Sequence, residues 1–172
     1  MAKVLIMASD GFEQSELFVP LEKLKDAGHD VTVAAPKAGA IKAWDKNDWG
    51  KSVTADKAIA DVDAAGYDAL VLPGGVINPD NLRKNEKAVA LIRGFADAGK
   101  PVAAICHAPW LLAEAGLAQG RRLTSYDSIR TDMRNAGAEV VDEKVVVDRG
   151  VITSRNPDDL DAFVGAIEDA LR

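Results

Sequence analysis

Short apolar runs alternate along this chain with segments in which apolar residues recur every three to four positions. The runs predict buried strands at residues 3–8, 30–35, 67–72 and 101–105. The intervening segments predict amphipathic helices; in the first, Leu17, Leu21 and Leu24 share one face and Gly28 ends the helix. Strands that alternate with helices are typical of βαβ units, so the pattern predicts an α/β fold with a mainly parallel central sheet.

Two stretches need a separate interpretation. Residues 41–44 and 52–55 predict short antiparallel strands around a polar turn, which is a small hairpin inserted into the α/β repeat. Further on, Asn78 and Pro79 predict the N-cap and first residue of a helix that runs to Gly99.

The last third of the chain continues the alternation. Residues 122–125, 145–147 and 151–154 predict strands, the last two forming an antiparallel pair. Residues 128–136 predict a helix, and another begins after Asn156. No linker or repeat interrupts the pattern, so residues 1–172 are interpreted as one domain.

The amino-acid composition of the chain argues against several classes of function. No apolar run approaches the roughly 18 residues of a membrane span, and the N-terminus has no basic leader, so we expect a cytoplasmic protein without membrane partners. The net charge of −6 argues against a nucleic-acid partner, because phosphate contacts need clustered Lys and Arg. A single cysteine, Cys106, excludes a disulfide within the chain and a cysteine-rich zinc site. This lone thiol is either buried filler or a reactive group.

The position of Cys106 favours reactivity. The predicted strand 101–105 runs straight into Cys106, and a short apolar helix follows, as in a nucleophile elbow. Ala103, Ala104 and Ala108 leave room for such a turn. A helix N-terminus and a nearby acid or imidazole would favour the thiolate, so we expect a solvent-accessible thiol with a lowered pKa. The alternative is a buried structural cysteine with His107 turned to solvent.

Three motifs carry a resemblance to a known family. They are Ala104-Ile105-Cys106-His107-Ala108-Pro109, Leu72-Pro73-Gly74-Gly75 and Asp10-Gly11-Phe12-Glu13. Together they closely resemble the PfpI family of intracellular proteases and deglycases, related to the Parkinson-disease protein deglycase and the class I glutamine amidotransferases. The resemblance spans nearly the whole chain. It implies a flavodoxin-like three-layer sandwich and a homo-oligomer, either a dimer or a hexamer built from dimers.

The resemblance also implies roles for individual residues. Cys106 would be the nucleophile and His107 its catalytic neighbour, while Glu13 would be the carboxyl group that reaches the thiol. Gly75 and the main chain at His107 would supply the oxyanion hole. The family's proteases complete a Cys-His-Glu triad with a carboxylate from a neighbouring subunit, and here the acid in that region is Asp80, with a shorter side chain.

Each of these residues also has an ordinary structural interpretation. Glu13 and Asp80 both lie at expected helix starts, where an acid complements the helix dipole, and His107 can be a surface imidazole.

Three functions fit this site. The first is a cysteine enzyme, without cofactor or metal, that acts on small reactive carbonyl compounds such as methylglyoxal or on glycated protein side chains (a glyoxalase III-like enzyme or protein deglycase). The second is an intracellular peptidase that uses Cys106, His107 and Asp80. The third is a non-enzymatic stress-response protein that senses oxidants through Cys106.

Overall fold

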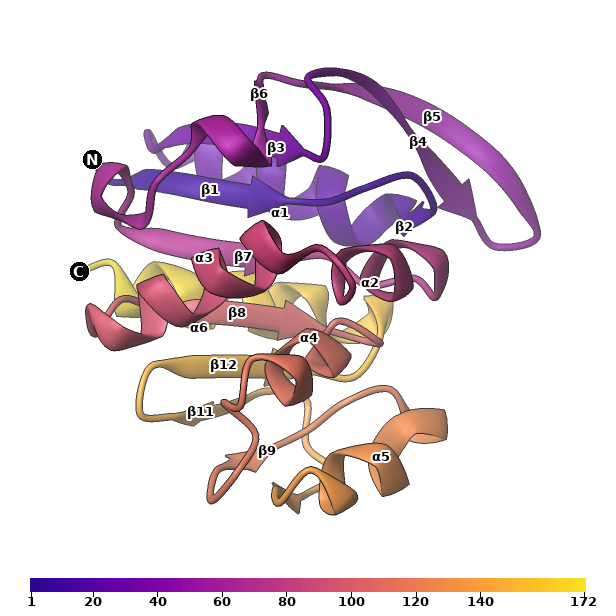
Figure 1. Ribbon diagram of the computed structural model, residues 1–172, viewed down its shortest axis with the longest axis vertical. Helices are drawn as coiled ribbons and strands as arrows, with labels where there is room; N and C mark the ends of the chain where they lie inside the picture. Colours follow the sequence, from indigo (N-terminus) through magenta and orange to yellow (C-terminus); the bar gives the residue numbers. More distant parts are fainter.

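The computed structural model describes residues 1–172 and has three layers, with a central sheet between two layers of helices (Figure 1). The sheet has seven strands in the order β11-β12-β8-β7-β1-β3-β6. The strands are β1 (Lys3–Met7), β3 (Asp30–Ala35), β6 (Lys57–Ala58), β7 (Ala69–Leu72), β8 (Val102–Ile105), β11 (Val146–Asp148) and β12 (Val151–Ser154). Every neighbouring pair is parallel except β11 and β12. The predicted α/β fold with a mainly parallel sheet is therefore confirmed.

The helices cover both faces of this sheet because successive side chains of a strand point to opposite sides. On β1, Val4 and Ile6 pack into one core with the apolar faces of α1 and α6, whereas Leu5 and Met7 pack into a second core with α3 and α4. The helices are α1 (Gln14–Asp26), α2 (Ile77–Leu82), α3 (Glu86–Asp97), α4 (Pro109–Glu114), α5 (Arg130–Asn135) and α6 (Leu160–Ala170). Single 3-10 turns are η1 (Ile59–Asp61), η2 (Ala64–Gly66), η3 (Asp127–Ile129) and η4 (Pro157–Asp159).

The predicted hairpin is present and extends from one end of the molecule (Figure 1). Its strands β4 (Gly39–Asp45) and β5 (Asp48–Ala55) are antiparallel, and the two-residue strand β2 (Phe12–Glu13) pairs with β4. Trp44 and Trp49 pack edge to face across the turn, with ring centroids 5.3 Å apart. The side chain of Gln14 accepts a hydrogen bond from the N–H of Lys51 at 2.8 Å. The hairpin is thus tied to the start of α1, close to the carboxyl ends of the central strands.

Two predictions about local structure were wrong. The expected long helix is divided into α2 and α3, and Asn85 rather than Asn78 caps α3. The Asn78 side chain is fully buried, where it accepts a hydrogen bond from Ser9 N–H and donates one to the carbonyl of Pro73. Its polar groups join two loops and are not free for a cap.

The segment 122–125 does not join the central sheet. Only β9 (Arg122–Leu123) is a strand, paired in parallel with β10 (Glu139–Val140), which the sequence pattern did not indicate.

Candidate active site

Cys106 forms a sharp elbow between β8 and α4. Its φ angle is +66°, a left-handed conformation that costs an L-residue with a side chain roughly 1–2 kcal/mol. The backbone holds it there on both sides: Cys106 N–H donates to the carbonyl of Ser154 at 3.1 Å, and its own carbonyl accepts from Tyr126 N–H at 2.8 Å. The elbow expected from the sequence is therefore present, and it places the thiol above the carboxyl end of β8.

Two glycines allow the loop after β7 to approach this elbow. A Cβ on Gly74 would lie 2.6 Å from Glu16 Oε1 and 2.7 Å from Cys106 Cβ, so no side chain fits there. Gly75 has a φ of +81°, and a Cβ on it would lie 2.5 Å from the carbonyl oxygen of Gly11. With the loop this close, the backbone N–H groups of Gly75 and His107 both reach the Cys106 sulfur. The family resemblance implies an oxyanion hole formed by these same two groups.

The carboxyl group that lies against the thiol belongs to Glu16, and the expectation that Glu13 fills this place is corrected. Glu13 is the N-cap of α1: its carboxylate accepts from Glu16 N–H at 3.1 Å and from the Ser15 hydroxyl. Glu16 lies one turn further along, on the inward face of α1, and is fully buried. Its Oε1 accepts from Gly74 N–H at 2.9 Å, Oε2 has no hydrogen-bond partner, and the carboxyl group lies close enough to the Cys106 thiol for the two groups to affect each other's pKa.

Burial and mutual repulsion control the protonation of this pair. Burial, and then the negative charge of Glu13, raise the pKa of the Glu16 carboxyl well above its usual value. Burial, and then the charge of Glu16, raise the pKa of the Cys106 thiol, while the Gly75 and His107 N–H groups oppose the increase. Two adjacent anions are disfavoured, so the pair retains one proton through neutral pH.

The expectation of an exposed thiol with a lowered pKa was wrong for two physical reasons. Cys106 is only 5% exposed, so desolvation disfavours the thiolate. Helix α4 begins three residues later and has only six residues, so its dipole has little effect at the sulfur. Only the backbone N–H groups of Gly75 and His107 stabilise a thiolate at this site, by hydrogen bonds to the sulfur.

His107 lies beside the sulfur and is held by aromatic rings. Its Nδ1 is 3.2 Å from Cys106 Sγ, and its Nε2 is 3.4 Å from the Ser128 hydroxyl. The ring stacks on Tyr126 at a centroid distance of 4.6 Å and meets Trp110 edge to face. Burial lowers the pKa of His107 below 6.5, only partly offset by the negative charge of Asp127. At pH 7 the imidazole is therefore neutral and can accept a proton.

Asp80 is not part of this cluster within one chain. It lies on the exposed side of α2, and no carboxylate is hydrogen-bonded to His107. Three residues of the site, Glu16, Tyr126 and Ser128, were not predicted from the sequence. A signal existed for Glu16 alone, because it is a charged residue on the same face of α1 as the apolar residues Leu17 and Leu24.

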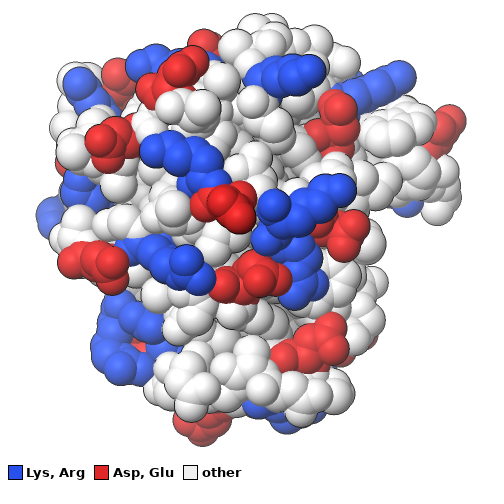
Figure 2. Space-filling model, in the orientation of Figure 1, with Lys and Arg blue, Asp and Glu red and all other residues white.

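Several wider features bear on function. No group of three or more His, Cys, Asp or Glu side chains is arranged to hold a metal ion. No helix has the length and apolar character needed to cross a bilayer. On the face shown in Figure 2, basic and acidic side chains are interspersed and form no continuous basic surface.

The fold and the elbow together define a class of protein: a flavodoxin-like sandwich whose cysteine lies at a nucleophile elbow, next to a buried carboxyl group. Comparison with known proteins gives the family. A model of the DJ-1/PfpI family matches residues 2–170, so the chain belongs to that family.

Its relatives include named deglycases. The chain is 46% identical over 170 residues to Deglycase TK1284 of Thermococcus kodakarensis, covering 99% of both chains. It is 45% identical to Protein/nucleic acid deglycase 2 of Escherichia coli, covering 94% of this chain and 92% of the other. Among solved structures, DJ-1beta of Drosophila melanogaster superposes with a TM-score of 0.89 at 32% identity, covering 98% of this chain and 89% of that chain.

Proposed function

We propose that this protein is a cysteine-dependent enzyme of the deglycase or glyoxalase III type, which acts on α-oxoaldehydes such as methylglyoxal and on their adducts with protein side chains. One observation carries the proposal: Cys106 Sγ lies between the Glu16 carboxyl, the N–H groups of Gly75 and His107, and the His107 imidazole at 3.2 Å. A nucleophile, a proton carrier, an oxyanion site and a base are thereby within reach of one carbonyl group. The names of the relatives support the same chemistry.

The first step is addition of the thiol to the aldehyde carbon. As the S–C bond forms, the single proton of the Cys106–Glu16 pair resides on Glu16, and the electrons of the C=O bond move to oxygen. The N–H groups of Gly75 and His107 stabilise this oxyanion. Glu16 then returns its proton to the oxyanion, which gives a neutral hemithioacetal and leaves the carboxylate free to act as a base.

The second step moves a proton between neighbouring carbons. A base moves the C–H proton of the hemithioacetal to the oxygen of the adjacent ketone, which gives an enediol. The second carbon then gains a proton and the hydroxyl group on the first carbon loses one, which gives a thioester of lactate. The buried carboxylate of Glu16 is suited to this transfer, because burial raises its pKa and so makes it a stronger base than an exposed carboxylate.

The last step is hydrolysis of the thioester. The neutral imidazole of His107 takes a proton from water, whose oxygen attacks the carbonyl carbon, and the Cys106 sulfur leaves. The sum of the steps is methylglyoxal plus water giving lactate. For a glycated side chain, the aldehyde carbon is already bonded to an amine, guanidine or thiol group. The Cys106 sulfur displaces that group, which leaves with the proton from Glu16, and the same hemithioacetal forms.

The two alternative functions fit the site less well. A Cys-His-acid peptidase needs a carboxylate on His107, where this chain has the Ser128 hydroxyl, so Asp80 would have to come from another subunit. A redox sensor would use the same Cys106 thiol but would give no role to the Glu16 carboxyl or to the His107 imidazole beside it.

We also propose that the protein works as a homo-oligomer. Val76 and Ile77, next to Gly75, are 53% and 39% exposed, and Trp49 on the hairpin is 44% exposed. Apolar side chains exposed near a catalytic site are suited to an interface between subunits.

Lactate production from methylglyoxal, measured with wild type, Cys106→Ser and Glu16→Gln, tests the proposal. We expect both substitutions to abolish turnover while circular dichroism stays unchanged. Glu13→Gln is the matched control and should retain more activity than Glu16→Gln, because Glu13 acts on the site only through its charge and does not contact the thiol. Equal rates for wild type and Cys106→Ser would refute the mechanism.

A further inference from the structure

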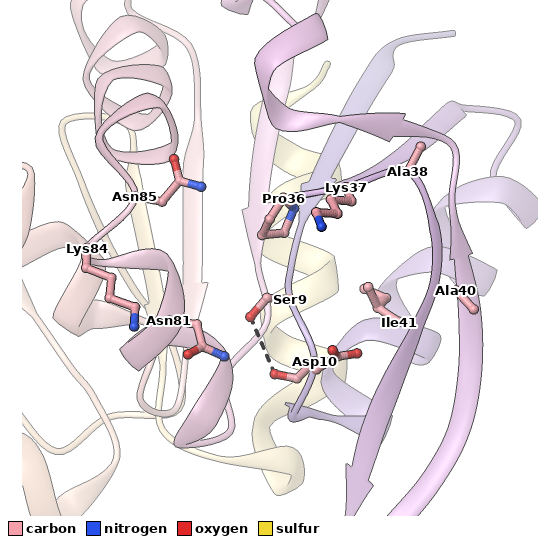
Figure 3. Close-up of a pocket in the computed structure, with 10 residues that line it drawn as sticks. All are labelled: Ser9, Asp10, Pro36, Lys37, Ala38, Ala40, Ile41, Asn81, Lys84 and Asn85. Atoms are coloured by element: carbon pink, nitrogen blue, oxygen red, sulfur yellow. Dashed lines mark hydrogen bonds between the residues drawn. The ribbon is translucent and has the colours of Figure 1, made fainter.

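Apart from the Cys106 site, the structure has a cleft where the loop after β1 faces the loop after β3 (Figure 3). Its volume is about 700 Å³, within the roughly 300–1,000 Å³ range of small-molecule sites. None of the groups around the Cys106 sulfur lines it. One wall is formed by residues 36–41, and the opposite wall by the segment from the end of α2 to the start of α3. The cleft is therefore at the carboxyl edge of the parallel sheet, where ligands of α/β proteins bind.

The walls carry an excess of positive charge. Lys37 lies on one wall and Lys84 on the other, and neither forms an ion pair with an acidic group of this chain. Asp10 is the one acidic residue of the lining, and its Oδ1 already accepts from Lys42 N–H at 2.8 Å. Unpaired ammonium groups on both sides of a cleft attract an anion into it.

The side-chain amides of Asn81 and Asn85 lie on the same wall as Lys84 and can donate hydrogen bonds to a ligand (Figure 3). Asn85 uses its side-chain oxygen to cap α3, accepting from Ala88 N–H at 3.1 Å, which leaves its amide hydrogens as donors. The side chain of Asn81 lies on this wall as well. Helix α3 has twelve residues, so its positive end adds to the field at Lys84. Ammonium and amide donors around one space match the several oxygens of a phosphate group.

Apart from Lys37, the wall formed by residues 36–41 is apolar. Pro36, Ala38 and Ile41 present side chains without polar atoms, and the proline ring fixes the backbone at the point where the chain leaves β3. Inorganic phosphate alone would leave this surface bare. A ligand that carries a flat apolar group as well as an anionic group would cover it.

We propose that this cleft binds a small organic phosphate monoester, with the phosphate between Lys37 and Lys84 and the apolar part against Pro36 and Ile41. The site is independent of the thiol chemistry at Cys106. It is a second ligand site on the carboxyl edge of the same sheet.

Isothermal titration calorimetry of the full-length protein with adenosine monophosphate tests this inference. Adenosine and inorganic phosphate, titrated separately, measure the binding of the apolar part and of the anionic part alone. We expect the monophosphate to bind with a Kd below about 1 mM and more tightly than either probe. The double variant Lys37→Ala/Lys84→Ala should bind at least about tenfold more weakly, because charge-assisted hydrogen bonds are lost. Lys87→Ala is the matched control, an exposed lysine of α3 outside the cleft, and should bind like wild type.

Three results would overturn the inference. They are the absence of binding at millimolar ligand, unchanged affinity in the double variant, and equal affinity for the monophosphate and inorganic phosphate. Cys106→Ser must bind the monophosphate like wild type; a loss of binding there would place the ligand at the thiol instead. Because that variant also removes the proposed catalysis, the two proposals fail separately.

Discussion

Gly74 is tightly packed on several sides, and Gly74→Ala tests how firmly the loop after β7 is fixed. A Cβ at this position would lie 2.6 Å from the Ile105 carbonyl oxygen, 2.6 Å from Glu16 Oε1 and 2.7 Å from Cys106 Cβ. The Ile105 carbonyl and the Cys106 Cβ belong to the strained elbow. They cannot move away unless the strand end moves with them.

The structure can respond to this substitution in two ways. Overpacking a well-filled interior costs about 1–3 kcal/mol. If the loop withdraws instead, the hydrogen bond from Gly74 N–H to Glu16 is lost, and an unsatisfied buried group costs about 1–3 kcal/mol. By either route we expect the free energy of unfolding to fall by about 1–3 kcal/mol, which lowers the melting temperature by about 2–12 °C for a chain of this size. Methylglyoxal turnover should be lost as well.

Gly165→Ala provides the opposite case within the same molecule. Gly165 lies inside α6, and a Cβ there meets nothing within 4 Å. Alanine should raise the free energy of unfolding by about 0.5–1 kcal/mol, because glycine is the poorer helix residue. Urea unfolding of both variants at one protein concentration, followed by circular dichroism, measures the difference. A Gly74→Ala protein as stable as wild type would refute the packing argument.

Three further predictions concern charge and pH. Glu16→Gln should be more stable than wild type at pH 8 and should lose this advantage at pH 4. A carboxyl group whose pKa is raised in the folded protein lowers the free energy of unfolding only at pH values above its pKa in the unfolded chain, about 4.5. Urea unfolding at both pH values measures the difference. Turnover should stay constant from pH 7.5 to below 6.5 and then fall, because burial lowers the pKa of His107 and the imidazole stays neutral until the pH is below 6.5. A half-maximal rate above pH 6.5 would contradict the assignment of His107 as the base. Lys23→Ala, which removes the exposed ion pair with Asp161, should change the free energy of unfolding by less than about 1 kcal/mol in urea.

Most of the central sheet, and the elbow at Cys106, could be predicted from the sequence pattern. Runs of buried apolar residues gave the central strands, because a parallel strand covered on both faces needs no alternation with polar residues. The elbow at Cys106 followed from a strand that runs into a short helix without a linker. Local signals failed at Asn78, because its amide groups serve contacts with Ser9 and Pro73, and Ser9 is far away in the sequence.

The chemistry of the site was less predictable. Motif spacing drew attention to Glu13, but helix geometry turns Glu16 inward, three positions later. The protonation state depends on desolvation and on the Glu16 charge, and neither is visible before the chain folds. Ser128 and Tyr126 reach His107 from a loop about twenty residues away, without a motif that marks them.

The left-handed backbone at position 106 has a consequence for how this protein can change by mutation. Glycine, and to a lesser degree asparagine, adopts that conformation more readily than cysteine does, so replacement of the thiol would relax the chain. A mutation that replaces the nucleophile with glycine therefore relieves backbone strain. In a lineage without selection for catalysis, we expect the fold to be retained while glycine accumulates at this position.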